Sequence, residues 1–161
     1  MRILAGIFLL LLPMLSYAQA NKKNYLEAAI YTSANLSLNT TTLLENQQTI
    51  SNAFYVTVRT EADDASVYAS IPLGVTTSTS TPMSVGNIKI KYNHTDCPAA
   101  QQKSINTNTV TMTSSNQLIF QQTKKGGVIA NWYYDIIIPA LGYNYVPGDY
   151  NFTFLFTMTQ P

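Results

Sequence analysis

The sequence holds few of the side chains that most enzymes and metal sites use. It has one cysteine (Cys97) and one histidine (His94), and charged residues make up only 11% of its 161 positions. An average soluble domain has about 25% charged residues. A lone cysteine excludes an intrachain disulfide, and we expect Cys97 to be buried, as free cysteines commonly are. The formal net charge of +1 gives no clustered positive face, so we predict neither a nucleic-acid partner nor electrostatic attachment to a membrane.

Long apolar runs are also scarce. The sequence has only one, at its N-terminus. Arg2 precedes the apolar run Ile3–Leu15, and Ala18 and Ala20 then form the small-x-small pattern that signal peptidase reads. The run is shorter than the roughly 20 residues that cross a bilayer. We therefore predict a removable signal peptide over residues 1–20, followed by a single domain over residues 21–161 with no membrane insertion after cleavage.

The sequence is rich in alternating apolar and polar residues, the pattern typical of half-buried β-strands. Phe54, Val56 and Val58 alternate with polar neighbours, and the pattern returns in several later segments. No segment has a convincing helical period, and residues 22–34 favour a strand or an extended arm. The further segments expected as strands are residues 67–71, 88–92, 110–112, 118–120, 132–138 and 150–158.

The segment from Trp132 to Ile138 is apolar on both faces, which is typical of a central strand. We expect Trp132 and Tyr134 to lie in the core, because they share a face with Ile136 and Ile138. The strands do not alternate with helices, which argues against a parallel α/β sheet. The predicted fold is therefore all-β, an immunoglobulin-like β-sandwich of about seven to eight antiparallel strands, with a jelly roll as the alternative.

Candidates for catalysis are weak. Cys97 and His94 would form the only Cys–His nucleophile pair, but they lie close together in one loop, with no third group nearby to orient them. Asp135 lies in an apolar strand and would need a second carboxylate facing it across a cleft. An aspartate in that position is more often hydrogen-bonded to backbone. We therefore predict that the protein is not an enzyme.

Candidates for metal binding are similarly limited. His94, Asp96 and Cys97 come from one short loop, and three such ligands without a second cluster fall short of a structural zinc site. The acidic segment Glu61–Asp64 has the side chains of a weak Ca²⁺ loop, but it also has the composition of a solvated hairpin turn. We predict neither a metal nor another cofactor.

Two tyrosines stand out as candidates for a contact surface. Tyr143 and Tyr145 lie in the Gly/Pro-rich segment before the last strand, where no obvious core is available to them. Exposed tyrosine rings are suited to contacts with proteins and sugars, because one ring combines an apolar body with a polar tip.

The segment from Val146 to Thr159 resembles the closing strand of secreted bacterial sandwich proteins, namely pilin subunits and immunoglobulin-like cell-surface domains. A Pro147-Gly148 turn, expected to be of type II with a positive φ at Gly148, leads into Tyr150 and then into alternating apolar and threonine residues. Resemblance to pilins of the chaperone–usher kind implies that a periplasmic chaperone pairs with this strand and that a neighbour's N-terminal arm completes the sheet. This chain lacks the paired-cysteine disulfide of that pattern, and its residues 21–40 alternate only loosely.

From these observations we expect a non-catalytic structural or adhesive protein of the bacterial surface, pilin-like or a component of a fimbrium. Its partners would be other proteins or copies of itself, or a glycan. A stand-alone extracellular module that binds carbohydrate or protein is the alternative. The short signal peptide is typical of bacteria, so the expected location is the periplasm, the cell surface or the medium.

Overall fold

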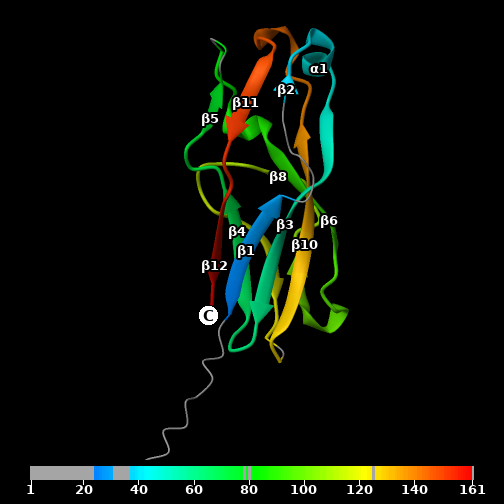
Figure 1. Cartoon of the computed structure of the whole chain (residues 1–161), viewed down its shortest axis with the longest axis vertical. Helices are drawn as coiled ribbons and strands as arrows, with labels where there is room; N and C mark the ends of the chain where they lie inside the picture. Colours follow the sequence, from blue (N-terminus) through cyan, green and yellow to red (C-terminus); the bar gives the residue numbers. More distant parts are fainter. Residues whose placement is uncertain (1–23, 31–36, 78, 80, 125, 161) are drawn as a thin grey trace, which may run out of the picture.

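The computed structural model describes residues 24–30, 37–77, 79, 81–124 and 126–160, which form an elongated sandwich with sheets along its long axis (Figure 1). All strand pairs in these residues are antiparallel, so the expected all-β sandwich is confirmed. No helix in this part of the chain is long and apolar enough to cross a membrane. The expected signal peptide, residues 1–20, lies outside the described residues.

One layer of the sandwich is a five-stranded sheet with the order β1-β3-β10-β6-β8. The strand β10 occupies its centre, as the sequence predicts for this segment. The strands are β1 (Tyr25–Ile30), β3 (Gln48–Thr60), β10 (Val128–Ile138), β6 (Lys89–Thr95) and β8 (Val110–Thr111).

The second layer contains a four-stranded sheet with the order β12-β4-β9-β7 and a three-stranded sheet with the order β2-β11-β5. The last two strands of the chain, β11 and β12, link these sheets because β12 continues β11 after a two-residue break. The four-stranded sheet has β12 (Leu155–Thr159), β4 (Ala65–Ser70), β9 (Gln117–Gln122) and β7 (Gln102–Ile105). The three-stranded sheet has β2 (Ser37–Leu38), β11 (Gly148–Phe152) and β5 (Val75–Thr77).

The alternation in the sequence decides which side chains enter the core. In β3, Phe54, Val56 and Val58 are buried, and β10 places Tyr134 and Trp132 opposite the first two of these. Side chains at period two on neighbouring strands face the same side of a sheet. The burial of Trp132 and Tyr134 confirms their expected place in the core, and Cys97 is also buried, as expected.

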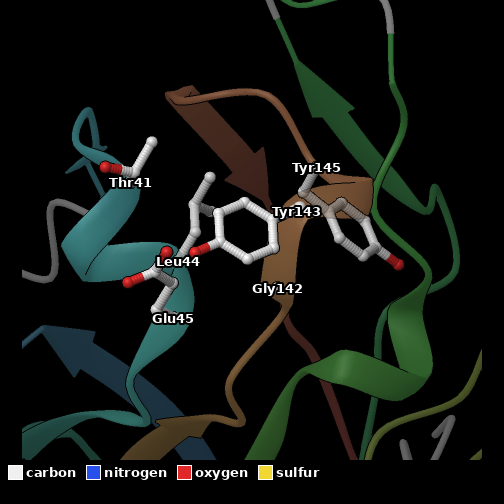
Figure 2. A pocket seen from close by; sticks show the side chains of 6 residues that line it. All are labelled: Thr41, Leu44, Glu45, Gly142, Tyr143 and Tyr145. Atoms are coloured by element: carbon white, nitrogen blue, oxygen red, sulfur yellow. The ribbon is translucent and has the colours of Figure 1, made fainter.

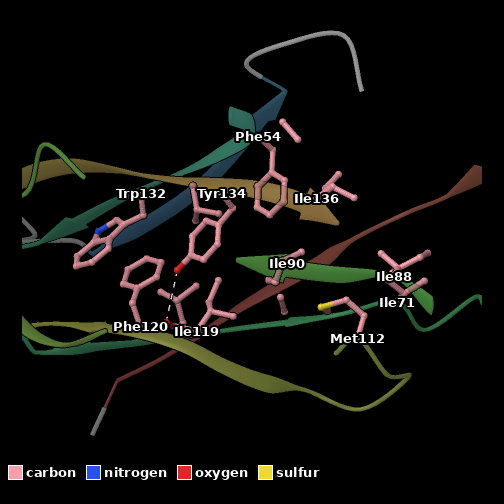
Figure 3. Close-up of a cluster of buried hydrophobic side chains, with 14 of the residues drawn as sticks. Phe54, Ile71, Ile88, Ile90, Met112, Ile119, Phe120, Trp132, Tyr134 and Ile136 are labelled. Carbon is pink, nitrogen blue, oxygen red and sulfur yellow. Dashed lines mark hydrogen bonds between the residues drawn. The ribbon is translucent and has the colours of Figure 1, made fainter. Parts of the chain in front are cut away.

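Figure 3 shows the core between the layers, where side chains from one sheet meet those of the other. The ring of Trp132 stacks on Phe120 of β9 with centroids 4.1 Å apart, and Tyr134 stacks on Phe54 at 5.4 Å. The Tyr134 hydroxyl donates a long hydrogen bond of 3.5 Å to the Ile119 carbonyl across the sandwich (Figure 3). Aromatic pairs of this kind add to the stabilisation that burial itself provides.

The structure differs from the sequence prediction in its short elements. A helix α1 (Thr41–Glu45) follows β2, and the Thr40 hydroxyl caps it by accepting a hydrogen bond from the Leu43 N–H. The described residues also contain three 3₁₀ turns, namely η1 (Val85–Asn87), η2 (Ala99–Gln101) and η3 (Gly142–Asn144).

The expected type II turn at Gly148 is wrong. Gly148 begins β11 and is not among the described residues with a positive φ, whereas Gly142 has a φ of 70° at the start of η3. The chain therefore reverses earlier than the Pro-Gly pair indicates. Gly148 instead pairs with Leu38 of β2.

Candidate functional site

The two candidate tyrosines lie at one end of the sandwich, beside α1. Tyr143 and Tyr145 line a surface hollow together with Gly142 and three residues of the helix, Thr41, Leu44 and Glu45 (Figure 2). The structure therefore brings the two tyrosines to one place. The sequence did not predict the helix that forms the other wall.

The two tyrosine rings differ in exposure. Tyr143 is 84% exposed, and its hydroxyl is directed to α1, beside the Glu45 carboxylate (Figure 2). The Glu45 carboxylate beside it raises the pKa of Tyr143 above its usual value. The Tyr145 ring is half-buried and turned towards η1, where its hydroxyl accepts a 2.8 Å hydrogen bond from Asn87 Nδ2.

A second group of aromatic side chains crosses the outward face of the five-stranded sheet. Tyr133 lies opposite Tyr55 of β3 on one side and opposite His94 of β6 on the other. The His94 and Tyr133 rings are stacked, with centroids 4.2 Å apart and planes 5° apart, and the Tyr55 ring is 5.5 Å from Tyr133. The rings cover each other's faces, so this row serves as a cross-strand contact between three strands.

Asp135 satisfies a backbone group at an irregularity between β3 and β10. The register shifts between Tyr134 and Ile136, and Asn52 of the facing strand has a φ of 49°. The Asn52 N–H donates to Asp135 Oδ1 at 2.8 Å, and Asn93 Nδ2 donates to the same atom at 2.7 Å. The expected backbone hydrogen bond of Asp135 is confirmed, and its carboxylate holds a β-bulge in place.

The structure does not pair Cys97 with His94. The Cys97 thiol is buried among core side chains and contacts the Pro98 carbonyl at 3.8 Å, whereas His94 is exposed and its Nδ1 is 2.9 Å from Asn93 Oδ1. Burial raises the pKa of Cys97 to about 11, which disfavours the thiolate that nucleophilic chemistry needs.

The acidic segment Glu61–Asp64 forms the turn between β3 and β4, and two of its three carboxylates, those of Glu61 and Asp64, have partners within the protein. Glu61 pairs with Arg59 at 2.5 Å, and Asp64 pairs with Lys103 at 2.8 Å. The Lys103 ammonium and the Lys124 N–H lower the pKa of Asp64. Among the residues that the structure describes, no group of three histidine, cysteine or acidic side chains is arranged to hold a metal ion.

One further feature concerns the last strand, which has an open edge. The strand β12 pairs with β4 on one side only, and no described strand pairs with its other side. Next to it, Phe154 and Phe156 reach across the sandwich to the Phe54 ring, with centroids 5.1 and 5.3 Å away, yet both remain half-buried. The sandwich thus combines unpaired backbone groups with partly exposed core aromatics along this side.

The strand β1 is the nearest element to this open edge in the other layer. It lies beside β12 in Figure 1 but pairs only with β3, with Tyr25 opposite Arg59 and Glu27 opposite Thr57. Asn24, just before β1, accepts the Glu61 N–H at 2.7 Å and so attaches the start of β1 to the β3–β4 turn.

Comparisons with known proteins give no relative for this chain: no protein-family model, curated protein or solved structure matched it.

Proposed function

We propose that this protein is an exported, non-catalytic structural or adhesive component of the bacterial surface, and that a β-strand from a second copy completes its sandwich. The observation that carries the proposal is the open edge of β12, together with the half-buried Phe154, Phe156 and Met158 beside it. An open edge with apolar side chains is an aggregation hazard that proteins normally protect. Pairing with a strand from another chain protects it and makes a fibre contact.

The order of the strands supports this proposal. In an immunoglobulin-type sandwich, strands A, B, E and D form one sheet and strands C, F and G the other. The order β1-β3-β10-β6 agrees with A-B-E-D, and β12 beside β4 agrees with F beside C. Among the described residues, no strand occupies the position of G, which would lie on the free side of β12.

A hydrogen bond at the start of β11 supports the same assignment. The Tyr150 hydroxyl donates to the Val146 carbonyl, four residues earlier, at 2.6 Å, and the Tyr150 side chain is 2% exposed. Immunoglobulin-like sandwiches have such a tyrosine corner near the start of strand F. This feature favours the immunoglobulin-like assignment over the jelly roll, with β11 and β12 together as strand F.

The first test is the size of the chain that starts at Asn21, after the expected cleavage position, measured by light scattering on a sizing column. In this proposal the strand that a second copy provides is its β1, exchanged from its own pairing with β3. We therefore expect oligomers or ladders, and we expect a variant that lacks residues 21–34 to be monomeric. Circular dichroism would establish that the shortened chain keeps its β-structure. A folded monomer from both chains would overturn self-assembly and favour the stand-alone binding module.

A matched pair of substitutions distinguishes strand addition at β12 from non-specific hydrophobic association. Leu155 on β12 is 49% exposed and Leu118 on the interior strand β9 is 38% exposed, both in the same sheet. A lysine on an edge strand opposes pairing between edges. We expect Leu155→Lys to shift the assembly towards monomer and Leu118→Lys to leave it unchanged; equal effects would contradict pairing at β12.

A further inference from the structure

The hollow between α1 and η3 is formed at the far end of the sandwich from the turn that joins β3 and β4 (Figure 1). It is therefore separate from the open edge that carries the proposed function. Its walls come from two segments that are distant in the sequence, residues 41–45 and residues 142–145.

Hydrogen bonds fix both walls. The Leu141 N–H donates to the Leu44 carbonyl at 2.7 Å, which joins the start of η3 to α1. The Tyr145 hydroxyl accepts a hydrogen bond from Asn87 at 2.8 Å, and the Tyr143 hydroxyl is directed to Glu45 (Figure 2). A site whose side chains are held before a ligand arrives loses less conformational freedom on binding.

The Tyr143 ring is presented to solvent at the rim of the hollow. Its side chain is 84% exposed, and its hydroxyl is directed to the helix (Figure 2). The chain reaches this position through Gly142, whose φ of 70° is accessible to glycine at little cost. The result is an aromatic surface in contact with solvent, next to the carboxylate of Glu45 and the hydroxyl of Thr41 (Figure 2).

We propose that this hollow binds a neutral pyranose unit of a glycan, with the sugar stacked on the Tyr143 ring and its hydroxyl groups donating to Glu45. A pyranose has an apolar C–H face and a rim of hydroxyl donors, which match an aromatic ring beside a carboxylate that only accepts hydrogen bonds. Among the described residues, Glu45 is the only charged residue that lines the hollow. Its negative charge disfavours uronic and sialic acids, because like charges repel.

The test is a titration of ¹⁵N-labelled protein with methyl hexopyranosides and N-acetylhexosamines, followed by NMR. One sugar ring on one open aromatic face gives a dissociation constant on the order of millimolar. We expect saturable shifts confined to the amides of residues 41–45 and 141–146. The absence of such shifts with every glycoside up to tens of millimolar would overturn the proposal.

Substitutions identify the groups involved. We expect Tyr143→Ala to weaken binding at least tenfold without changing the unfolding midpoint, because the ring is mostly exposed. We expect Glu45→Gln to weaken neutral glycosides several-fold and to remove the discrimination against methyl glucuronide. The control is Ile129→Ala, a 57% exposed residue near the start of β10, at the other end of the molecule. Equal affinity in Tyr143→Ala, or tighter binding of the glucuronide by the unaltered protein, would contradict the assignment.

The outcome is independent of strand exchange. A monomeric protein that binds glycosides at the hollow would support this inference and overturn self-assembly. Oligomers that bind no glycoside would do the opposite.

Discussion

The interior of the sandwich contains a polar group whose removal gives a quantitative prediction. Gln122 and Trp132 are both fully buried, and Gln122 Oε1 accepts the indole N–H of Trp132 at 3.0 Å. Gln122 Nε2 donates to Thr60 Oγ1 at 2.9 Å. Thr60 in turn donates to the Thr123 carbonyl at 3.1 Å. Replacing Gln122 by methionine keeps the volume and removes the acceptor.

The cost of Gln122→Met follows from the group left without a partner. Among the described residues, Gln122 is the only acceptor for the indole N–H of Trp132, and a buried unsatisfied donor costs about 1–3 kcal/mol. Thr60 keeps its bond to Thr123, and methionine leaves little cavity because its volume is similar. We expect the free energy of unfolding to fall by about 2 kcal/mol, which lowers Tm by about 4–8 °C for a domain of this size.

The assay is equilibrium unfolding in guanidinium chloride. Trp132 is the only tryptophan in the sequence, so its fluorescence reports directly on the site, while far-UV circular dichroism reports on the sheets. If the free energy of unfolding keeps the same slope against denaturant concentration while the midpoint falls, the variant has lost stability and exposes the same surface on unfolding. A loss of less than about 0.5 kcal/mol, the range typical of surface substitutions, would refute the reasoning.

A double-mutant cycle distinguishes the lost hydrogen bond from a general packing defect. In a Trp132→Phe background no indole N–H is left to satisfy, so Gln122→Met should cost less there. We expect a coupling energy of about 1–2 kcal/mol, as for residues that share a hydrogen bond. The same cost in both backgrounds would show that the indole–amide bond contributes nothing.

Three further predictions concern single groups. Tyr150→Phe removes the bond to Val146 and should lower stability by about 1 kcal/mol, measurable by calorimetry as a Tm lower by about 2–4 °C; an unchanged Tm would contradict the corner's role. The raised pKa of Cys97, about 11, predicts slow labelling by thiol reagents in the native state at pH 8, whereas immediate labelling would show an accessible thiolate. It also predicts that the free energy of unfolding falls as pH rises from about 9 to 11. The lowered pKa of Asp64 predicts a stabilisation that is present above the ordinary pKa of 3.8 and is lost as pH falls below it. Asp64→Asn should therefore reduce the loss of stability at acid pH in a pH titration of unfolding. We expect a difference of under about 1 kcal/mol, because the pair with Lys103 is exposed.

The positions of the main strands could be predicted because burial on one face of a sheet requires a period of two. Phe54, Val56 and Val58 enter the core as their alternation indicates, and the two-sided apolar segment around Trp132 is the central strand. The short elements could not be predicted in the same way. The helix α1 has only five residues, which is too short to show a helical period, and its one local signal is the capping hydroxyl of Thr40.

The candidate site was predictable only in part, for a related reason. The loop position of Tyr143 and Tyr145 indicated exposure, which the structure bears out for Tyr143 but only partly for Tyr145. The sequence contained no sign that Glu45 would face Tyr143, because the two residues are nearly a hundred positions apart and meet only through tertiary packing. Contacts of this kind depend on the topology, which alternation does not specify.

The open edge of β12 shows the limit of the pattern most clearly. Alternation from Tyr150 to Met158 correctly assigns one face of the last strand to the core, yet it says nothing about which strands lie on either side of it. Tyr150 at the start is 2% exposed, while Phe154, Phe156 and Met158 stay half-buried. The difference arises because burial of an edge residue needs a neighbour beside it as well as a layer above it. The strand β12 is as apolar as the interior strands, yet it lies where one neighbour is missing. This is the physical reason to look for that neighbour in another chain.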